Sequence, residues 1–314
     1  MKKHNTHSGR NFGYGKQLAY AGKQALNDRF GDDGKYATKA SHHARFKQFA
    51  TWCKAIGIVD ARYIDSQHIA AYCKELNEQI NSGDKSISYA QNQISSVNVV
   101  LSTMRSDNKL TVSPSKVLSQ RTHIRESVPL SLDRNQYQQA LGKLQNDEAK
   151  AAVMLAREFG LRLREVALFR PGEAIKQVNQ LGHINIQRGT KGGRTADRLI
   201  TPNNRQLETL HFVQAVVGKD HCLVDKVGKL TTWRNQLYKE YRDSGAQALL
   251  GKFHDNRAAF ACEVYKQLTS KDAPVVYGKR MADKQSDLMA RKHCSQLLGH
   301  NRVDVMASYI GSAK

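Results

Sequence analysis

The sequence lacks any long apolar segment. No uninterrupted apolar run reaches the 18 or more residues that a membrane-spanning helix needs. The first residues, MKKHN, also lack the apolar core of a secretory signal. Neither a membrane span nor secretion is supported, and we expect a cytoplasmic protein.

The cysteines show neither a disulfide framework nor a metal-binding pattern. There are five, an odd number, widely scattered and never spaced as Cys-x-x-Cys, which favours reduced thiols. His293 and Cys294 are adjacent, but neighbouring residues of a helix point about 100° apart and no second ligand pair lies nearby. We therefore predict no metal ion and no other cofactor.

Acidic residues are scarce relative to basic ones. The sequence has 49 Lys plus Arg against 28 Asp plus Glu, a formal charge of +21. Such an excess favours a polyanionic partner, through phosphate contacts and release of counterions. At 314 residues and 40% apolar content, the chain can form two domains with proper cores and is not a wholly disordered basic chain. Composition thus favours a nucleic-acid partner.

Apolar periodicity predicts a helical N-terminal bundle. Three stripes with helical spacing follow one another, over residues 46–56, 69–80 and 87–104. The second stripe comes after the capping candidates Asp65 and Ser66. Such stripes can be buried only against each other, which predicts a helical domain over residues 37–110. Residues 1–36 are rich in Gly and Lys and indicate a flexible basic arm with one short helix, which could be a fourth in the bundle.

A linker and a second domain follow. Over residues 111–130 the apolar period fades and Ser, Pro and basic residues accumulate, which is typical of a linker that lies on a phosphate backbone. Over residues 131–314 helical periodicity returns, and residues 183–187 alternate polar and apolar before a Gly-Gly turn. We predict a mainly α protein: an N-terminal helical bundle plus an α+β domain with a small antiparallel sheet, whose hairpin carries Lys191.

Four polar motifs and a tyrosine stand in order in the second domain. They are GLRLRE (160–165), TKGGR (190–194), HDNR (254–257), LGH (298–300) and Tyr309 in a possible helix over residues 301–310. A phosphodiester resists attack because its nonbridging oxygens are negative, and fixed cations, preferably bidentate arginines, relieve this. His254 and Arg257 would emerge on one side of a helix over residues 253–268, at the end where the helix dipole favours an anion. The motifs indicate a phosphodiester-handling site with a tyrosine nucleophile.

The order Arg, Lys, His-x-x-Arg, Leu-Gly-His, Tyr resembles that of the tyrosine recombinases, the lambda-integrase-like site-specific recombinases. The resemblance covers the second half of the chain well and the first half in outline. It implies a SAM-like core-binding domain and a catalytic domain that clamp double-stranded DNA at specific recombination sites. It further implies a homo-tetramer on synapsed DNA in the nucleoid. The implied reaction is integration or excision of a mobile element, and an accessory DNA-bending protein could take part.

The resemblance implies covalent chemistry at Tyr309. This residue would attack the scissile phosphorus and form a 3′-phosphotyrosyl bond, which allows rejoining without ATP or metal. Arg162 and Arg257 would hold the nonbridging oxygens.

The resemblance also implies roles for the remaining site residues. Lys191 would protonate the leaving 5′ oxygen, and His254 would assist proton transfer at the tyrosine. His300 would donate a hydrogen bond to a nonbridging oxygen. Glu165 would be a supporting residue that orients the first arginine.

Each motif by itself has an ordinary structural explanation. These explanations are a surface Arg–Glu pair, a solvated basic turn, a chance match, a helix end and a core aromatic residue. The conjunction of all five favours catalysis. Two other functions stay open: a type IB topoisomerase-like nicking and rejoining enzyme, and a non-catalytic DNA-binding regulator on the same scaffold.

The spacing between His254 and His300 is longer than the family pattern. The additional residues fall at about 270–287 and carry a cluster of basic side chains. They could contact DNA or a neighbouring protomer, or form a solvated insertion.

Overall fold

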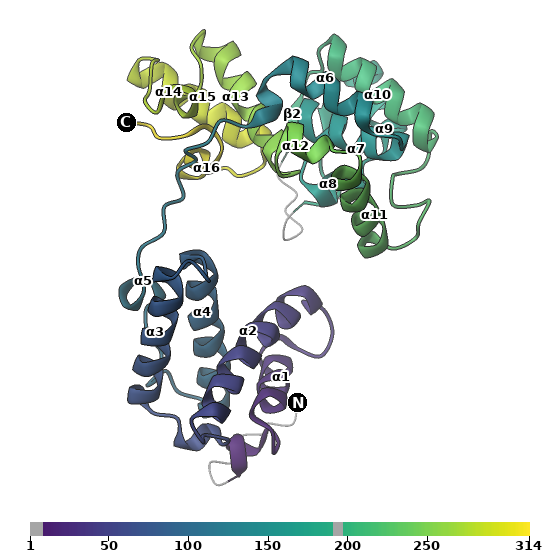
Figure 1. Ribbon diagram of the computed structural model, residues 1–314. Helices are drawn as coiled ribbons and strands as arrows, with labels where there is room; N and C mark the ends of the chain where they lie inside the picture. The colour runs from purple at the N-terminus through teal and green to yellow at the C-terminus, as the bar shows by residue number, and fades with distance from the viewer. Residues whose placement is uncertain (1–8, 191–196) are drawn as a thin grey trace. The chain divides into compact units, whose positions relative to one another are not determined.

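The computed structural model describes residues 9–190 and 197–314, which belong to two compact units (Figure 1). The first unit ends at Thr122 and the second begins at His123. Helices dominate both, and the described strands form a two-stranded antiparallel sheet. The predicted fold class, mainly helical with a small antiparallel sheet, is confirmed.

The described part of the first unit is a helical bundle. Its elements are η1 (Arg10–Gly13), α1 (Leu18–Phe30), α2 (Tyr36–Ala55), η2 (Ala61–Tyr63), α3 (Ser66–Asn81), α4 (Ile87–Arg105) and α5 (Pro114–Val117). Asp65 caps α3 as predicted, because its side chain accepts the backbone N–H of His68. The three predicted apolar stripes meet in one core, around Phe46, Leu76 and Ile94.

From residue 9 onward, the segment predicted as a flexible arm is part of the folded bundle, and the short helix expected there is the possible fourth helix of that bundle. Helix α1 packs against α2 and α4, and Leu18 and Leu26 are buried in the core of the bundle. Gly22 permits this close approach, since an added Cβ would lie 2.3 Å from the ring of Phe46. Alanine and glycine supply much of the buried face of α1, so its apolar stripe is faint in the sequence.

The linker predicted over residues 111–130 is shorter than expected. The carbonyl of Val112 accepts a hydrogen bond from the Asn98 side chain at 2.7 Å, and Leu118 is buried in the core of the bundle. Beyond Thr122, the backbone N–H of Arg125 donates to the carbonyl of Ala307 at 2.8 Å. Both ends of the predicted linker are therefore parts of folded units.

The second unit begins with a 3-10 helix, four α-helices and the two strands. These elements are η3 (Leu130–Leu132), α6 (Arg134–Lys143), α7 (Asp147–Glu158), α8 (Leu163–Ala167), α9 (Pro171–Leu181), β1 (Ile184–Asn185) and β2 (Leu199–Ile200). In the sheet Ile184 pairs with Ile200 and Asn185 pairs with Leu199, which matches the predicted hairpin, although β1 is shorter than the alternating segment.

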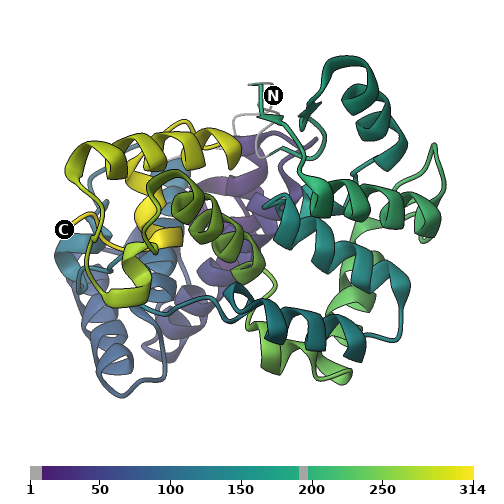
Figure 2. The ribbon, with the colours of Figure 1, turned by 90° about the horizontal axis from the view of Figure 1, so that it is seen from above.

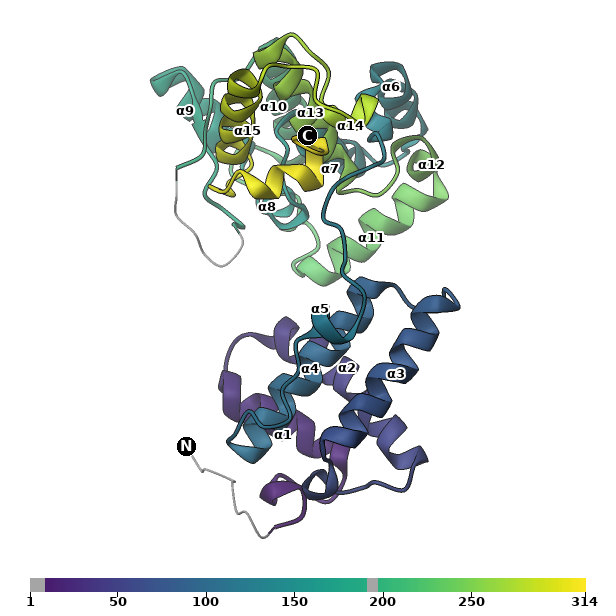
Figure 3. The same cartoon turned by 90° about the vertical axis from the view of Figure 1, so that its left-hand side faces the viewer.

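The rest of the second unit is helical. Its elements are α10 (Asn204–Val217), α11 (Leu230–Asp243), α12 (Ala246–Leu250), α13 (Asp255–Thr269), α14 (Pro274–Tyr277), α15 (Lys284–Leu297), η5 (Asp304–Met306) and α16 (Ala307–Ile310). Helix α13 packs against α7, α15 and α16, and Figure 2 and Figure 3 show the C-terminal segments gathered beside it.

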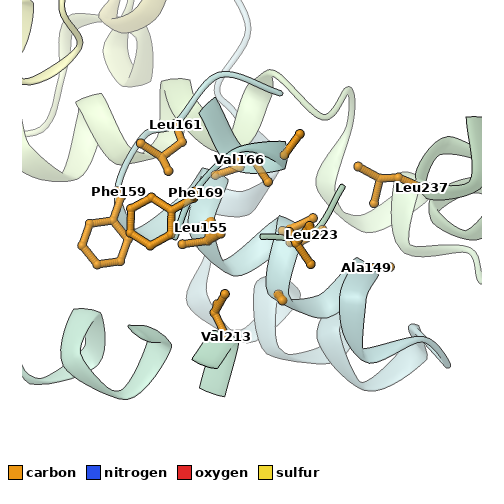
Figure 4. Close-up of a cluster of buried hydrophobic side chains, with 14 of the residues drawn as sticks. Ala149, Leu155, Phe159, Leu161, Val166, Phe169, Val213, Leu223 and Leu237 are labelled. Carbon is orange, nitrogen blue, oxygen red and sulfur yellow. The ribbon is translucent and has the colours of Figure 1, made fainter. Parts of the chain in front are cut away.

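Two apolar clusters flank the region where α7 ends and α13 begins. One contains Leu155, Phe159 and Val166, shown in Figure 4. The other contains Tyr265, Leu298 and the apolar ring of Tyr309. Burying a side chain such as Phe159 contributes roughly 1.5–3 kcal/mol, so these clusters fix the segments between them firmly.

The described residues can also be searched for membrane-spanning helices, metal sites and disulfides. Among the helices in residues 9–190 and 197–314, none is long and apolar enough to cross a bilayer. Within those ranges no group of three His, Cys, Asp or Glu side chains could hold a metal ion. The five cysteines are buried and form no disulfide, as expected of reduced thiols.

Candidate active site

The first motif places a buried carboxylate at the start of α8. Arg162 caps this helix, and its backbone N–H and its Nη1 each donate to the Glu165 side chain at 2.7 Å. The carboxylate is only 1% exposed. The ordinary explanation of this motif, a surface Arg–Glu pair, is therefore wrong, because the pair closes into the interior.

Two more guanidinium groups surround Glu165. Arg198 Nη1 lies 2.8 Å from Oε2, and Arg257 Nη1 lies 3.6 Å from the same oxygen. Burial alone would raise the pKa of Glu165, but the charges of Arg198 and Arg257 outweigh it and hold the pKa below its usual range. One carboxylate among three guanidiniums leaves a positive balance suited to a phosphate.

Arg257 lies in the first turn of α13 and is fully buried. Its guanidinium donates to the carbonyls of Gly160 and Leu298, and Nε lies 3.4 Å from the hydroxyl of Tyr309. Burial, followed by the charge of Arg198, lowers the pKa of Arg257. An arginine keeps its charge despite such a shift, since its ordinary pKa is above about 12.

Two glycines bring the backbone carbonyls to these arginines. Gly160 has φ +59°, and an added Cβ would lie 2.4 Å from the ring of Phe260. Gly299 has φ +63° and ends α15, with the N–H of His300 returning to the carbonyl of Ser295 at 2.9 Å. The Leu-Gly-His motif is thus both an ordinary helix end and a part of the site.

Tyr309 reaches the cluster from within its own chain. Its hydroxyl lies 3.0 Å from Nε2 of His300, and its ring centroid lies 5.6 and 5.5 Å from the ring centroids of His254 and His300. The single helix predicted over residues 301–310 is wrong. Asn301 adopts φ +53°, which interrupts the helix, and Tyr309 is carried by the short α16.

The hydrogen-bond partners of His300 fix its protonation. Nε2 lies 3.2 Å from Nη2 of Arg162 as well as 3.0 Å from the Tyr309 hydroxyl. A guanidinium can only donate, so Nε2 carries the lone pair and the phenol donates to it. Burial, followed by the charges of Arg257 and Arg162, lowers the pKa of His300 to about 3. His300 is therefore a neutral acceptor at neutral pH.

His254 occupies the outer edge of the cluster. It precedes α13 at the N-cap position and keeps an exposed surface. Surrounding protein atoms, followed by the charge of Arg257, lower its pKa. Its ring is tilted by 55° against the ring of Tyr309, whereas the imidazole nitrogen within hydrogen-bond distance of the Tyr309 hydroxyl belongs to His300.

Lys191 lies outside the described residues, as do 192–194 of its motif. The structure brings together the other predicted site residues, Arg162, Glu165, His254, Arg257, His300 and Tyr309.

Two arginines of this region are missing from the predicted site. Arg198 donates to Glu165 and to the carbonyls of Phe159 and Gly160, and it is 2% exposed. Its sequence signal was the alternation of β2, since Arg198 falls on the same face as the buried Ile200. Arg125, which we expected on a phosphate backbone, instead forms an ion pair with Asp255 at 2.9 Å.

A family comparison agrees with this geometry. Residues 120–263 match the family model described as Integrase, and this segment contains Arg162, Glu165, His254 and Arg257. Over these residues the chain is similar to the integrases. The match ends before His300 and Tyr309. No curated protein sequence matches the chain.

Solved structures of recombinases share its fold. A lambda integrase fragment, crystallised as a dimer bound to a COC′ core site, has 17% identity and a TM-score of 0.57, covering 92% of this chain and 94% of that one. A Tn1549 transposon integrase fragment in complex with circular intermediate DNA has 16% identity and a TM-score of 0.54, covering 93% and 96%. A lambda integrase tetramer bound to a Holliday junction has 16% identity and a TM-score of 0.55, covering 91% and 74%.

Proposed function

We propose that this protein is a tyrosine recombinase, which cleaves and rejoins DNA at specific sites through a phosphotyrosyl intermediate at Tyr309. One observation carries the proposal: the Tyr309 hydroxyl lies 3.0 Å from an imidazole acceptor and 3.4 Å from a buried guanidinium of its own chain. A nucleophile, a proton acceptor and fixed cations thus meet at one point, which is what attack on a phosphodiester requires.

The arginines would bind the phosphate. Nη2 of Arg162 and Nη2 of Arg257 both donate to the carbonyl of Leu298, so their donor groups already converge. In the substrate complex these groups would turn to the nonbridging oxygens and stabilise the charge that grows on them in the transition state. Glu165 and Arg198 would keep both guanidiniums in place.

The reaction would then proceed as follows. The Tyr309 oxygen bonds to phosphorus while the bond from phosphorus to the 5′ oxygen breaks, leaving a 3′-phosphotyrosine and a free 5′ hydroxyl. The phenol proton passes to Nε2 of His300, and Lys191 would supply the proton that the 5′ oxygen takes up. Attack by a 5′ hydroxyl from the partner strand reverses these transfers and rejoins the DNA.

This assignment shifts one role from His254 to His300. The resemblance implied that His254 assists proton transfer at the tyrosine and that His300 donates to the phosphate. The 3.0 Å contact between Nε2 of His300 and the Tyr309 hydroxyl supports His300 as the proton acceptor. His254 would help to fix the orientation of the phenol ring through its ring contact.

The rest of the molecule would bind and assemble on DNA. We propose that the first unit is the core-binding domain and the second unit the catalytic domain, with the formal charge of +21 supporting phosphate contacts along duplex DNA. A homo-tetramer on two synapsed sites is proposed by analogy with the lambda integrase tetramer on a Holliday junction. Integration or excision of a mobile element is the proposed biological reaction.

Covalent capture of DNA tests this function. Purified protein is incubated with fragmented genomic DNA from its host, and adducts that survive detergent are recovered and sequenced. We expect adducts at a defined sequence with the wild type and with Tyr277→Phe, which changes an exposed side chain, and none with Tyr309→Phe.

The outcomes separate the alternatives. Adducts that exchange strands between two copies of the recovered site support a recombinase. Adducts without sequence preference or strand exchange would indicate a topoisomerase-like enzyme. Specific binding without any adduct would indicate a regulator and contradict the proposal.

A further inference from the structure

The segment that follows Tyr309 lies on the added residues 270–287. Gly311, with φ +87°, is so close to α14 that an added Cβ would lie 2.6 Å from the backbone nitrogen of Val275. Ala273, Val275 and Ala282 belong to the same apolar cluster as Tyr309. The inner face of this insertion is therefore occupied by the protein's own C-terminal segment.

A buried ion pair reaches across to the same segment. Arg291 and Asp287, one turn apart on α15, are each 3% exposed. Nε of Arg291 donates to both carboxylate oxygens of Asp287, at 3.1 and 2.9 Å, and the hydroxyl of Tyr265 donates to the same carboxylate at 2.8 Å.

The remaining donors of Arg291 bind backbone carbonyls behind the nucleophile. Nη1 donates to the carbonyl of Gly311 at 3.1 Å, and Nη2 donates to the carbonyl of Ser312 at 2.8 Å. A buried ion pair by itself is weak support for stability, because apolar residues of similar size often serve equally well. A guanidinium, however, can fix a carboxylate and two carbonyls at once.

The chain is also held on the N-terminal side of Tyr309. The backbone N–H of Arg125 donates to the carbonyl of Ala307 at 2.8 Å. The short helix α16 carries few internal hydrogen bonds, so its place depends on these contacts at either end. A shift of α16 would move the Tyr309 hydroxyl away from His300.

We infer that Arg291, Asp287 and Tyr265 form a latch that positions the nucleophile, and that residues 270–287 build the surface on which the latch closes. The inference rests on the proposed role of Tyr309. None of the three residues touches the cationic cluster, so they are positioning residues, and their effect passes through the backbone of residues 311–312 to Tyr309.

Two independent substitutions should each disrupt the latch. Arg291→Met removes both bonds to the C-terminal segment, and Gly311→Ala pushes that segment away from Val275 without touching the ion pair. Their matched controls are Lys292→Met, an exposed loss of charge on the same helix, and Gly278→Ala, at another positive φ with open space around it. Arg291→Lys keeps a charge opposite Asp287 and should be intermediate.

Two measurements are made on each full-length variant. Hydrogen exchange followed by mass spectrometry reports opening of residues 307–314, without any DNA. The rate of adduct formation is measured on saturating concentrations of a DNA site recovered by covalent capture. In both latch variants we expect faster hydrogen exchange over residues 307–314 and adduct formation that is about 10–100-fold slower, because a misplaced reacting group loses roughly this much rate. DNA affinity should be unchanged. Both control variants should stay within about twofold of the wild type.

The outcomes decide the inference separately from the proposed function. Exchange that stays at the wild-type level in both variants would overturn the latch. So would adduct formation that is unchanged or faster despite faster exchange, because the contacts would then not position the nucleophile. If the wild type forms no adduct with any DNA, the proposed function fails, and the exchange data alone show whether the contacts hold the segment.

Discussion

At the scale of single residues, the site depends on one carboxylate that organises three cations. Arg162 and Arg257 come from distant motifs, and both contact Glu165, which also pairs with Arg198. Guanidiniums repel one another unless an anion lies between them. Glu165 therefore lets two arginines converge on a phosphate before the phosphate arrives, and such preorganisation is a major source of catalytic power.

Arg198 should be needed for stability as well as for activity. Arg198→Met would leave buried carbonyls without donors and Glu165 with one partner fewer, and breaking a buried pair typically costs about 3–5 kcal/mol. Urea denaturation should show a loss of that order. Arg188→Met, on an exposed pair with Glu173, should change the free energy of unfolding by less than about 1 kcal/mol. Equal small losses in both variants would contradict the buried role of Arg198.

His300 should make stability depend on pH. Its pKa in the folded state is about 3, below the ordinary 6.5. Between about pH 6.5 and about pH 3, His300 therefore binds a proton in the unfolded chain but stays neutral in the folded chain. This contribution to stability is complete above about pH 6.5 and decreases toward pH 3, by at most about 1.4 kcal/mol per pH unit.

Denaturation of His300→Gln and the wild type at several pH values tests this. As the pH falls from about 7 to about 5, the free energy of unfolding should drop more steeply for the wild type than for the variant. A stability difference that does not vary with pH would mean that His300 is not the neutral acceptor described.

At the scale of secondary structure elements, the ends of helices build the site. Arg162 begins α8, His254 precedes α13, and Gly299 ends α15. Helix ends expose backbone groups that need partners, and the buried arginines supply donors to these carbonyls. The side chains of the candidate site are therefore held by segments whose own backbone is already fixed.

Gly160 should tolerate no side chain. An added Cβ would meet the ring of Phe260 at 2.4 Å, at a φ of +59° that already disfavours other residues. We expect Gly160→Ala to lose about 2–4 kcal/mol of stability, from strain and overpacking together. Gly182→Ala, at φ +73° with nothing within 4 Å, should lose only about 1–2 kcal/mol. Thermal unfolding of the two variants measures the difference, and equal losses would show that the Phe260 contact is unimportant.

The sequence predicted strongly periodic elements better than short or irregular ones. Helices α2, α3 and α4 follow from their apolar stripes, and the antiparallel pairing of β1 with β2 agrees with the alternation at residues 183–187. Helix α1 was taken for part of an arm because small residues form its contact face. The helix expected over residues 301–310 is interrupted because Asn301 adopts a positive φ, which no periodicity indicates.

The same limit applies to the site. Motif order predicted Arg162, Arg257, His300 and Tyr309, and the structure brings these four side chains together. Arg198 belongs to no motif, and its role depends on a tertiary contact with Glu165. Which histidine meets the phenol depends on the path of the chain between Gly299 and α16, which sequence spacing does not determine.

At the scale of the whole molecule, the described part of each chain surrounds its own tyrosine with arginine and histidine side chains. The contacts of Tyr309 with Arg257 and His300 are made within one chain. Cleavage should therefore occur in cis, even within a tetramer. Mixing Tyr309→Phe with Arg257→Ala should yield no covalent adduct, because neither protein has both the nucleophile and the cation. Recovery of adduct in the mixture, with each variant inactive alone, would show cleavage in trans.

The central claim is that Tyr309 becomes covalently joined to DNA. The most direct measurement is mass spectrometry of the trapped adduct after digestion with nuclease and trypsin. Our account predicts that the peptide spanning residues 303–314 carries a nucleotide remnant on the Tyr309 oxygen. A remnant on any other residue, or an adduct that persists in Tyr309→Phe, would contradict it.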